Sequence, residues 1–142
     1  MTPVAFWDAS MLVPLFVEQT PYSQKCRELL LRYRVCAWWG TSVEMESAFS
    51  RLHRSGDLKD ADWKACSSAL DRMSRGWLLV EPSETVRIEA RRLLRLYALR
   101  AGDALQLAAA LSWCENKPQA EIFLTGDQRL SEAAVLCGFT VL

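Results

Sequence analysis

The fold class follows from the stretch Val4-Ala5-Phe6-Trp7-Asp8, in which four apolar residues lead directly into a carboxylate. A continuous apolar run of this length is typical of a β-strand that is buried on both faces. Four later runs have the same short, apolar character, and they are Val35–Trp38, Trp77–Val80, Glu121–Leu124 and Phe139–Leu142. We therefore expect five short strands, of which Val4–Trp7 is the first.

Helical patterns separate these strands along the chain. The expected helices are a short one from Ser10 and longer ones over Pro21–Arg34, Ser42–Ser55, Asp60–Ser74, Pro82–Leu99, Ala104–Cys114 and Leu130–Cys137, with Gly138 as the C′ residue of the last. The helix over Ala104–Cys114 is apolar nearly all round, which predicts that it is buried. Short apolar strands that alternate with helices predict an α/β fold with a parallel sheet covered on both faces.

Length and charge limit the possible classes of protein. The chain has 142 residues and is about half apolar, which is typical of one globular domain with a real core. Its formal net charge is zero, so it lacks the global basic field of many nucleic-acid binders. Arginine nevertheless outnumbers lysine by 13 to 4, and local basic patches for phosphate or carboxylate groups remain possible.

The spacing of the cysteines and the hydropathy of the chain indicate the cellular compartment in which the protein is expected. The five cysteines include no pair at CxxC spacing, so neither a zinc site nor a disulfide framework is indicated. We expect them to be small buried hydrophobic residues in a reducing environment. No apolar run reaches the roughly 18 residues that span a bilayer, and no signal peptide is evident at the start. The expectation is a cytoplasmic protein without a membrane segment.

Four acidic residues are placed where a site would form. Asp8 and Asp127 lie at or just after the ends of expected strands, while Glu44 and Asp103 lie in the first turns of expected helices. Sites in parallel α/β sheets form outside the carboxyl ends of the strands. We therefore expect all four carboxylates on the same rim of the sheet.

Each carboxylate also has a purely structural explanation. Asp103 and Asp127 are suitable helix N-caps, and Thr41 with Glu44 fits a capping box. Asp8 is harder to explain in this way, because an unpaired charge beside a buried strand is costly. Four acidic groups on one rim repel one another, and a divalent cation such as Mg²⁺ would relieve that repulsion. The only histidine, His53, lies late on a helix and is expected to be structural or on the surface.

The chain resembles a PIN domain, and specifically the toxin ribonucleases of the VapC type. Four stretches carry the resemblance, and they occur in the family's order: Phe6–Ser10, Val43–Arg51, Arg100–Ala110 and Phe123–Leu130, followed by Ala133, Ala134 and Gly138. In the second stretch, the spacing to Ala48 and Arg51 selects Glu44 over Glu46 as the family's glutamate. The resemblance covers the chain almost from end to end.

The resemblance implies a single PIN domain over residues 1–142, with a three-layer α/β/α sandwich around a central, mostly parallel, five-stranded sheet. It implies that Asp8, Glu44 and Asp103 are the main ligands of Mg²⁺ or Mn²⁺ and that Asp127 completes the catalytic cluster. Ser10 and Thr125 would hydrogen-bond the scissile phosphate or orient a carboxylate. Substrate would also contact arginines on the glutamate helix, namely Arg51 and Arg54.

The implied activity is hydrolysis of RNA by metal-activated water. A protein of this type is an endoribonuclease and the toxin of a type II toxin–antitoxin pair, with a cognate antitoxin as partner. The family commonly forms homodimers. Single-stranded or looped RNA is the expected substrate, because its bases and backbone are accessible.

Three alternatives are open. A catalytically weak PIN module could act as a binding or assembly protein, with Trp38 and Trp39 as part of a partner surface. A phosphoacceptor receiver domain would need an acidic pair near its first strand and a later lysine, and neither is present. A haloacid-dehalogenase-type phosphatase would need Asp-x-Asp, whereas Ser10 occupies the third place after Asp8.

Overall fold

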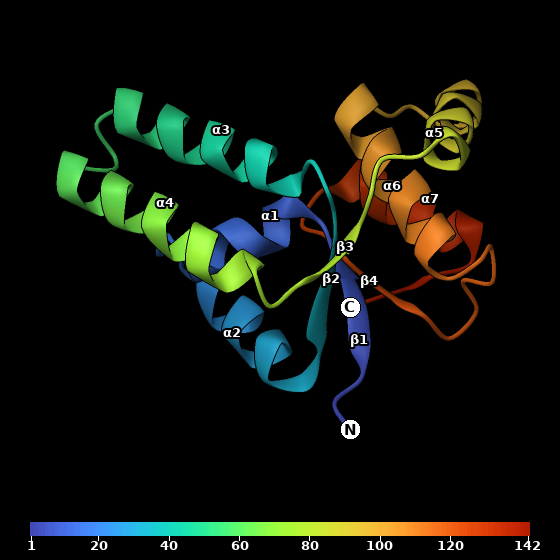
Figure 1. The fold of residues 1–142 in the computed structure, drawn as a ribbon, viewed down its shortest axis with the longest axis horizontal. Helices are drawn as coiled ribbons and strands as arrows, with labels where there is room; N and C mark the ends of the chain where they lie inside the picture. Colours follow the sequence, from blue (N-terminus) through green and yellow to red (C-terminus); the bar gives the residue numbers. More distant parts are fainter.

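Five parallel strands form the middle layer of the computed structural model, which describes all residues from Met1 to Leu142 (Figure 1). The strands are β1 (Val4–Trp7), β2 (Arg34–Trp38), β3 (Leu78–Val80), β4 (Ile122–Leu124) and β5 (Thr140–Val141). Their order across the sheet is β3-β2-β1-β4-β5, and every pairing is parallel. The expected α/β fold with five strands is confirmed, and the sheet is wholly rather than mostly parallel.

Helices cover both faces of this sheet. The helices are α1 (Ala9–Leu12), α2 (Tyr22–Arg32), α3 (Thr41–Arg54), α4 (Asp60–Ser74), α5 (Glu84–Leu96), α6 (Ala101–Trp113) and α7 (Gln128–Cys137), with a 3₁₀ turn over Val13–Leu15. Figure 1 shows α1 to α4 on one side of the strands and α5 to α7 on the other. The molecule is therefore a three-layer α/β/α sandwich.

The central strand β1 explains why its sequence shows no polar alternation. Successive side chains of a strand point to opposite faces of the sheet. Phe6 packs into the core beneath α5 to α7, whereas Ala5 and Trp7 pack into the core beneath α1 to α4. All three are fully buried, so apolar residues are required at every position.

Helix α6 is buried as expected. Its small residues Ala104, Ala108 and Ala109 are wholly inaccessible to solvent, and it packs closely against α5. Small side chains allow the helix to approach β2 and β3 closely.

Several element boundaries differ from the sequence-based expectation. Helix α2 ends at Arg32 because Tyr33 is extended, and Arg34 then pairs with Val4 in the sheet. Helix α5 ends at Leu96 for the same reason, since Tyr97 is extended. Helix α6 begins at Ala101, three residues before the expected start, because its N-cap is Arg100 rather than Asp103. The strands β3, β4 and β5 are each shorter than expected.

The binding-module alternative placed Trp38 on a partner surface, and this placement is wrong. Trp38 is only 8% exposed and packs in the core with α5 and α6, whereas Trp39 is 53% exposed. His53 is engaged in structure as expected, because it contacts Asp60 and stacks on Trp63 with ring centroids 4.0 Å apart. These contacts join the ends of α3 and α4.

The cysteines agree only in part with the expectation that all five are buried. All five cysteines are free thiols; Cys26, Cys36 and Cys66 are buried, and the other two are half-buried. Burial raises the pKa of Cys36 to about 12, which makes this thiol unreactive. None of the helices combines the length and hydropathy needed to cross a bilayer.

Gly138 ends α7 in the left-handed conformation, with φ of 113°, as its C′ position predicts. A Cβ at this position would lie 3.0 Å from Cγ of Pro118. We expect Gly138→Ala to lower the free energy of unfolding by more than about 1–2 kcal/mol, because the contact adds to the left-handed backbone cost. Urea denaturation measures this change.

Gly56 provides the matched control for Gly138→Ala. It also has a positive φ, of 84°, but a Cβ there would meet no atom within 4 Å. Gly56→Ala should therefore show the backbone cost alone. Equal losses in the two variants would mean that the approach to Pro118 does not constrain the residue.

Candidate active site

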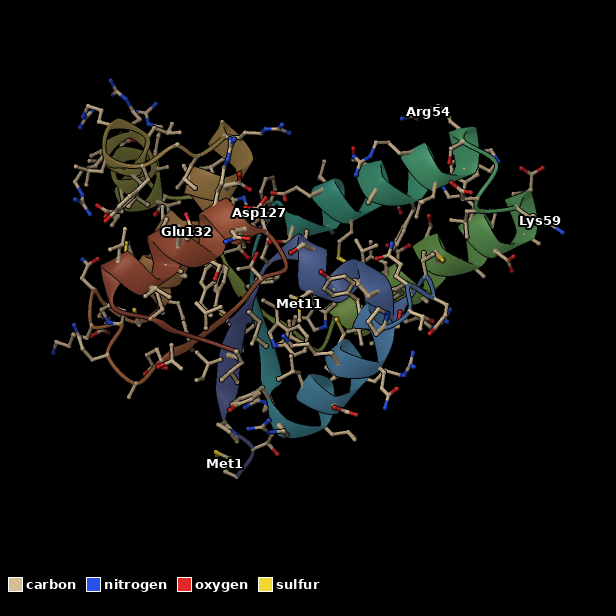
Figure 2. All side chains as sticks on the ribbon, turned by 180° about the vertical axis from the view of Figure 1, so that it is seen from behind. Met1, Met11, Arg54, Lys59, Asp127 and Glu132 are labelled. Atoms are coloured by element: carbon tan, nitrogen blue, oxygen red, sulfur yellow. The ribbon has the colours of Figure 1, made fainter.

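One groove collects the four acidic residues singled out in the sequence. It has a volume of about 680 Å³, and Asp8, Glu44, Asp103 and Asp127 all line it. They come from the end of β1 and from the first turns or caps of α3, α6 and α7. Figure 2 shows Asp127 at the start of α7, on the side that faces α3. The common rim expected from the sequence is present.

Asp8 is the most deeply placed of these carboxylates. Its backbone N–H donates to the carbonyl oxygen of Leu124 at 2.9 Å, which continues the pairing of β1 with β4. Its side chain is held by two hydroxyl groups, from Ser10 at 2.6 Å and from Thr125 at 2.9 Å. Burial raises the pKa of Asp8, and these hydrogen bonds partly oppose that rise.

Ser10 and Thr125 also join the two loops that carry Asp8 and Asp127. The Ser10 hydroxyl oxygen accepts from the N–H of Gly126 at 2.8 Å, and that of Thr125 accepts from the N–H of Asp127 at 3.0 Å. The two side chains therefore orient a carboxylate, which is one of the two roles considered for them. Contact with a substrate phosphate stays a prediction.

Glu44 faces the groove and does not cap its helix. Helix α3 begins after Gly40 without a side-chain cap, so the capping-box interpretation of Thr41 and Glu44 is wrong. Burial, and then the nearby charge of Asp8, raise the pKa of Glu44 to about 7. Glu46 lies elsewhere, because its carboxylate accepts a hydrogen bond from Ser67 on α4 at 3.0 Å.

Gln106 is a site residue that the sequence reasoning missed. It is fully buried on α6, and its Nε2 donates to Oγ1 of Thr41 at 3.0 Å and to Oε1 of Glu44 at 3.2 Å. Its Oε1 has no hydrogen-bond partner. The available signal was a single amide in an otherwise apolar helix, because a buried polar group needs partners.

Asp103 and Asp127 combine structural positions with places in the groove. Asp103 accepts weakly from the N–H of Arg100 at 3.4 Å, and Oδ1 of Asp127 accepts from the N–H of Leu130 at 2.9 Å as the N-cap of α7. Burial, followed by the charge of Asp127, raises the pKa of Asp103, and Arg100 opposes this rise. The cap explanation of Asp127 is thus correct, and it does not remove the carboxylate from the groove.

The donor set suits a hard divalent cation, although no ready-made cage exists. No lysine, arginine or histidine forms an ion pair with any of the four carboxylates. No three His, Cys, Asp or Glu side chains are close enough to share one ion as they stand. Mg²⁺ commonly keeps several waters and binds one or two carboxylates directly, which fits an open groove of this kind.

Comparison with known proteins supports the fold. No protein-family model matches the sequence, and no curated protein sequence matches it. Solved structures do match: PAE2754 from Pyrobaculum aerophilum has a TM-score of 0.68 and 19% identity, covering 99% of this chain and 90% of the other. FitAcB from Neisseria gonorrhoeae has a TM-score of 0.68 and 16% identity, covering 98% and 96%. VapBC2 from Rickettsia felis, bound to a promoter DNA fragment, has a TM-score of 0.66 and 10% identity, covering 98% of each chain.

The chain has the PIN-domain fold of the VapC type. The expected α/β/α sandwich is therefore confirmed by its own topology and by three structures that it matches over nearly its whole length. Identities below 20% show the fold alone. Because one fold can carry several functions, the function depends on the groove itself.

The raised pKa of Glu44 predicts a pH-dependent effect on stability. Because its pKa is about 7 in the folded protein and 4.5 ordinarily, the stability contributed by its protonation is full below about pH 4.5 and is lost as the pH rises through 7. Glu44→Gln cannot lose this proton. In EDTA at pH 8, we expect the free energy of unfolding of Glu44→Gln to exceed that of the parent by about 1 kcal/mol, a value that allows for the partial exposure of this side chain. This difference corresponds to a rise of about 2–4 °C in Tm.

The control for this variant is Glu46→Gln, two residues along the same helix but bonded to α4. Thermal unfolding at pH 5 and pH 8 should show a pH-dependent gain for Glu44→Gln only. If the two variants changed the stability of the parent equally at pH 5 and at pH 8, burial of Glu44 would not be the cause of the pH dependence.

Proposed function

We propose that this PIN domain is a Mg²⁺- or Mn²⁺-dependent endoribonuclease that cleaves RNA phosphodiester bonds with metal-activated water. We further propose that it is the toxin of a type II toxin–antitoxin pair. The observation that carries the proposal is the groove in which Asp8, Glu44, Asp103 and Asp127 meet without an ion-pair partner. Raised pKa values at the first three are what unneutralised, partly buried carboxylates should show.

Each residue has a defined part in this proposal. Asp8, Glu44 and Asp103 would hold the cation, directly or through water, and Asp127 would complete the cluster. When bound, the cation lowers the pKa of a water molecule and offsets negative charge around the phosphorus. Ser10 and Thr125 keep the Asp8 carboxylate in a fixed orientation, and Gln106 does the same for Glu44.

No side chain needs to act as nucleophile. His53 is occupied by Asp60 and Trp63 at the far end of α3, and it does not line the groove. None of the five cysteines lines the groove either. Hydrolysis by water held among carboxylates requires neither a Ser–His–Asp nor a Cys–His set.

The test is cleavage of short single-stranded RNA with Mn²⁺. Asp8→Asn and Glu44→Gln should each lower the rate by at least about 100-fold, because each removes a charged ligand, and EDTA should abolish cleavage. Glu46→Gln should leave the rate unchanged, since this side chain bonds Ser67 instead. Cleavage that survives EDTA and Asp8→Asn would refute the proposal.

A partner-binding role has one specific observation in its favour. Trp39 and Val43 are 53% and 69% exposed, and Val43 lines the same groove as the carboxylates. Exposed apolar side chains of this size commonly mark protein-binding surfaces. A binding module without catalysis is therefore the second candidate, and the cleavage assay with Asp8→Asn separates it from the enzyme.

The proposed partners are a cognate antitoxin, an RNA substrate and a second copy of the chain, acting in the cytoplasm. Matched structures include a toxin–antitoxin complex from Klebsiella pneumoniae and FitAB bound to a DNA fragment, which supports an antitoxin as partner. Free thiols throughout the chain are consistent with a reducing compartment. Sedimentation equilibrium measures whether the purified chain is a homodimer.

A further inference from the structure

The groove that holds the carboxylates continues into a second cavity along α3. This second cavity, of about 530 Å³, shares Val13, Gln19, Ala48 and Arg51 with the groove. It extends to Arg54 and Ser55 at the end of the helix. Figure 2 shows Arg54 at the end of α3 that is remote from Asp127. One open channel therefore leads from the carboxylates to two arginines.

A third cavity continues the groove in the other direction. It has a volume of about 390 Å³ and shares Arg100, Asp103 and Asp127 with the groove. It extends to Gln128 and Arg129 at the start of α7. The carboxylates thus lie between two arginine pairs. We call them the α3 arm (Arg51 and Arg54) and the α6–α7 arm (Arg100, the N-cap of α6, and Arg129 on α7).

None of these four arginines forms an ion pair. Elsewhere in the chain, Arg87 and Arg92 on α5 are held by Glu84 and Glu89 one turn away. Arg51 makes only a 3.3 Å hydrogen bond to the hydroxyl of Ser47, another residue that lines the groove. Guanidinium groups in this condition are free to bind an anion bidentately.

We propose that the three connected cavities form one track for single-stranded RNA, in which the two arms bind phosphates on opposite sides of the bond to be cut. This inference rests on the proposed function, and it adds where the strand runs. Because arginines line both ends of the track and the carboxylates lie between them, the RNA strand enters at one end, passes the carboxylates and leaves at the other end. The bond that is cut is therefore internal.

The spacing along α3 suits such a strand. Glu44, Ser47 and Arg51 follow one another at helical intervals, so Arg51 lies about two turns, or about 10 Å, beyond Glu44. A strand that runs along α3 from Glu44 can therefore bring a phosphate beyond the one at the carboxylates to Arg51. Arg54 lies about one turn further, within reach of the next phosphates. The repeated negative charge of RNA matches positive groups placed at intervals on each side.

An acidic peptide is the competing occupant, since arginine also binds carboxylates. RNA is favoured because its phosphates repeat at every nucleotide, so one strand can meet the arginines of both arms, and because a guanidinium group binds phosphate bidentately. The polar side chains Ser47, Gln19 and Gln128, which line the three cavities, can hydrogen-bond a sugar–phosphate backbone.

The test is binding of a fluorescein-labelled 16-nucleotide single-stranded RNA in Ca²⁺, followed by anisotropy over a range of salt concentrations. Ca²⁺ offsets the charge of the carboxylates with oxygen ligation, and gel analysis of the RNA after each titration shows whether binding was measured without cleavage. Arg51→Ala, Arg54→Ala, Arg100→Ala and Arg129→Ala should each weaken binding about 3- to 10-fold at low salt. Each should lower the slope of log K against log salt by about 0.7, as the loss of one phosphate contact predicts.

Arg91→Ala is the matched control, because Arg91 is an exposed arginine on α5 that lines none of the three cavities. It should leave both affinity and slope unchanged. A double variant with one change in each arm should lose about the product of the two single losses. Unfolding curves for every variant show whether a loss reflects the fold instead.

The outcomes separate the track from the proposed activity. Losses in both arms, with no cleavage in Mn²⁺, would uphold the track and refute the enzyme. Cleavage by the unmodified protein, with all four variants binding like Arg91→Ala, would refute the track alone. Loss in one arm only would refute the two-sided arrangement. If a polyglutamate peptide bound with the same dependence on arginine while RNA did not, the occupant would be an acidic peptide.

Discussion

The burial of Asp8 at the end of β1 is the constraint on which the rest of the site depends. A carboxylate in this position is costly unless hydrogen bonds compensate for lost hydration. The compensation comes from Ser10, the second residue of α1, and from Thr125, which follows β4 more than a hundred residues later. The same two hydroxyl groups bind the loop N–H groups of Gly126 and Asp127. Holding Asp8 therefore also fixes the position of Asp127.

The parallel sheet converts this local arrangement into a shared site. Because all five strands point the same way, the segments after β1, β2 and β4 emerge at one edge. Helices α3 and α7 start there, and α6, which packs across β2, brings Asp103 and Gln106 to the same edge. The result is a set of carboxylates along one groove, where burial and then neighbouring negative charge raise the pKa values of Asp8, Glu44 and Asp103. Such an arrangement is unfavourable without a cation, which is why a metal-dependent function suits it.

Charge along the groove is arranged differently from charge on part of α5. Arg87 and Arg92 on α5 are paired with neighbouring glutamates, whereas the arginines along the groove and its two extensions have no acidic partner in an ion pair. A net charge of zero therefore conceals a local separation into an acidic centre and two basic arms. This pattern depends on which helix faces come together and not on overall composition.

The sequence by itself determined the strands, most helices and the four acidic positions, because short apolar runs and helical periodicity are local properties that burial imposes directly. The resemblance to the PIN family's glutamate motif also favoured Glu44 over Glu46, and the structure places only Glu44 in the groove. The tertiary structure alone decided that Thr41 and Glu44 form no capping box and that Trp38 is buried. It also decided that Gln106 on α6 donates a hydrogen bond to Glu44 on α3. It likewise placed Arg100 in the groove with Arg51, and Arg129 in the cavity that continues the groove. These features arise from contacts between segments far apart in the chain, whose distances and facing sides no local pattern encodes.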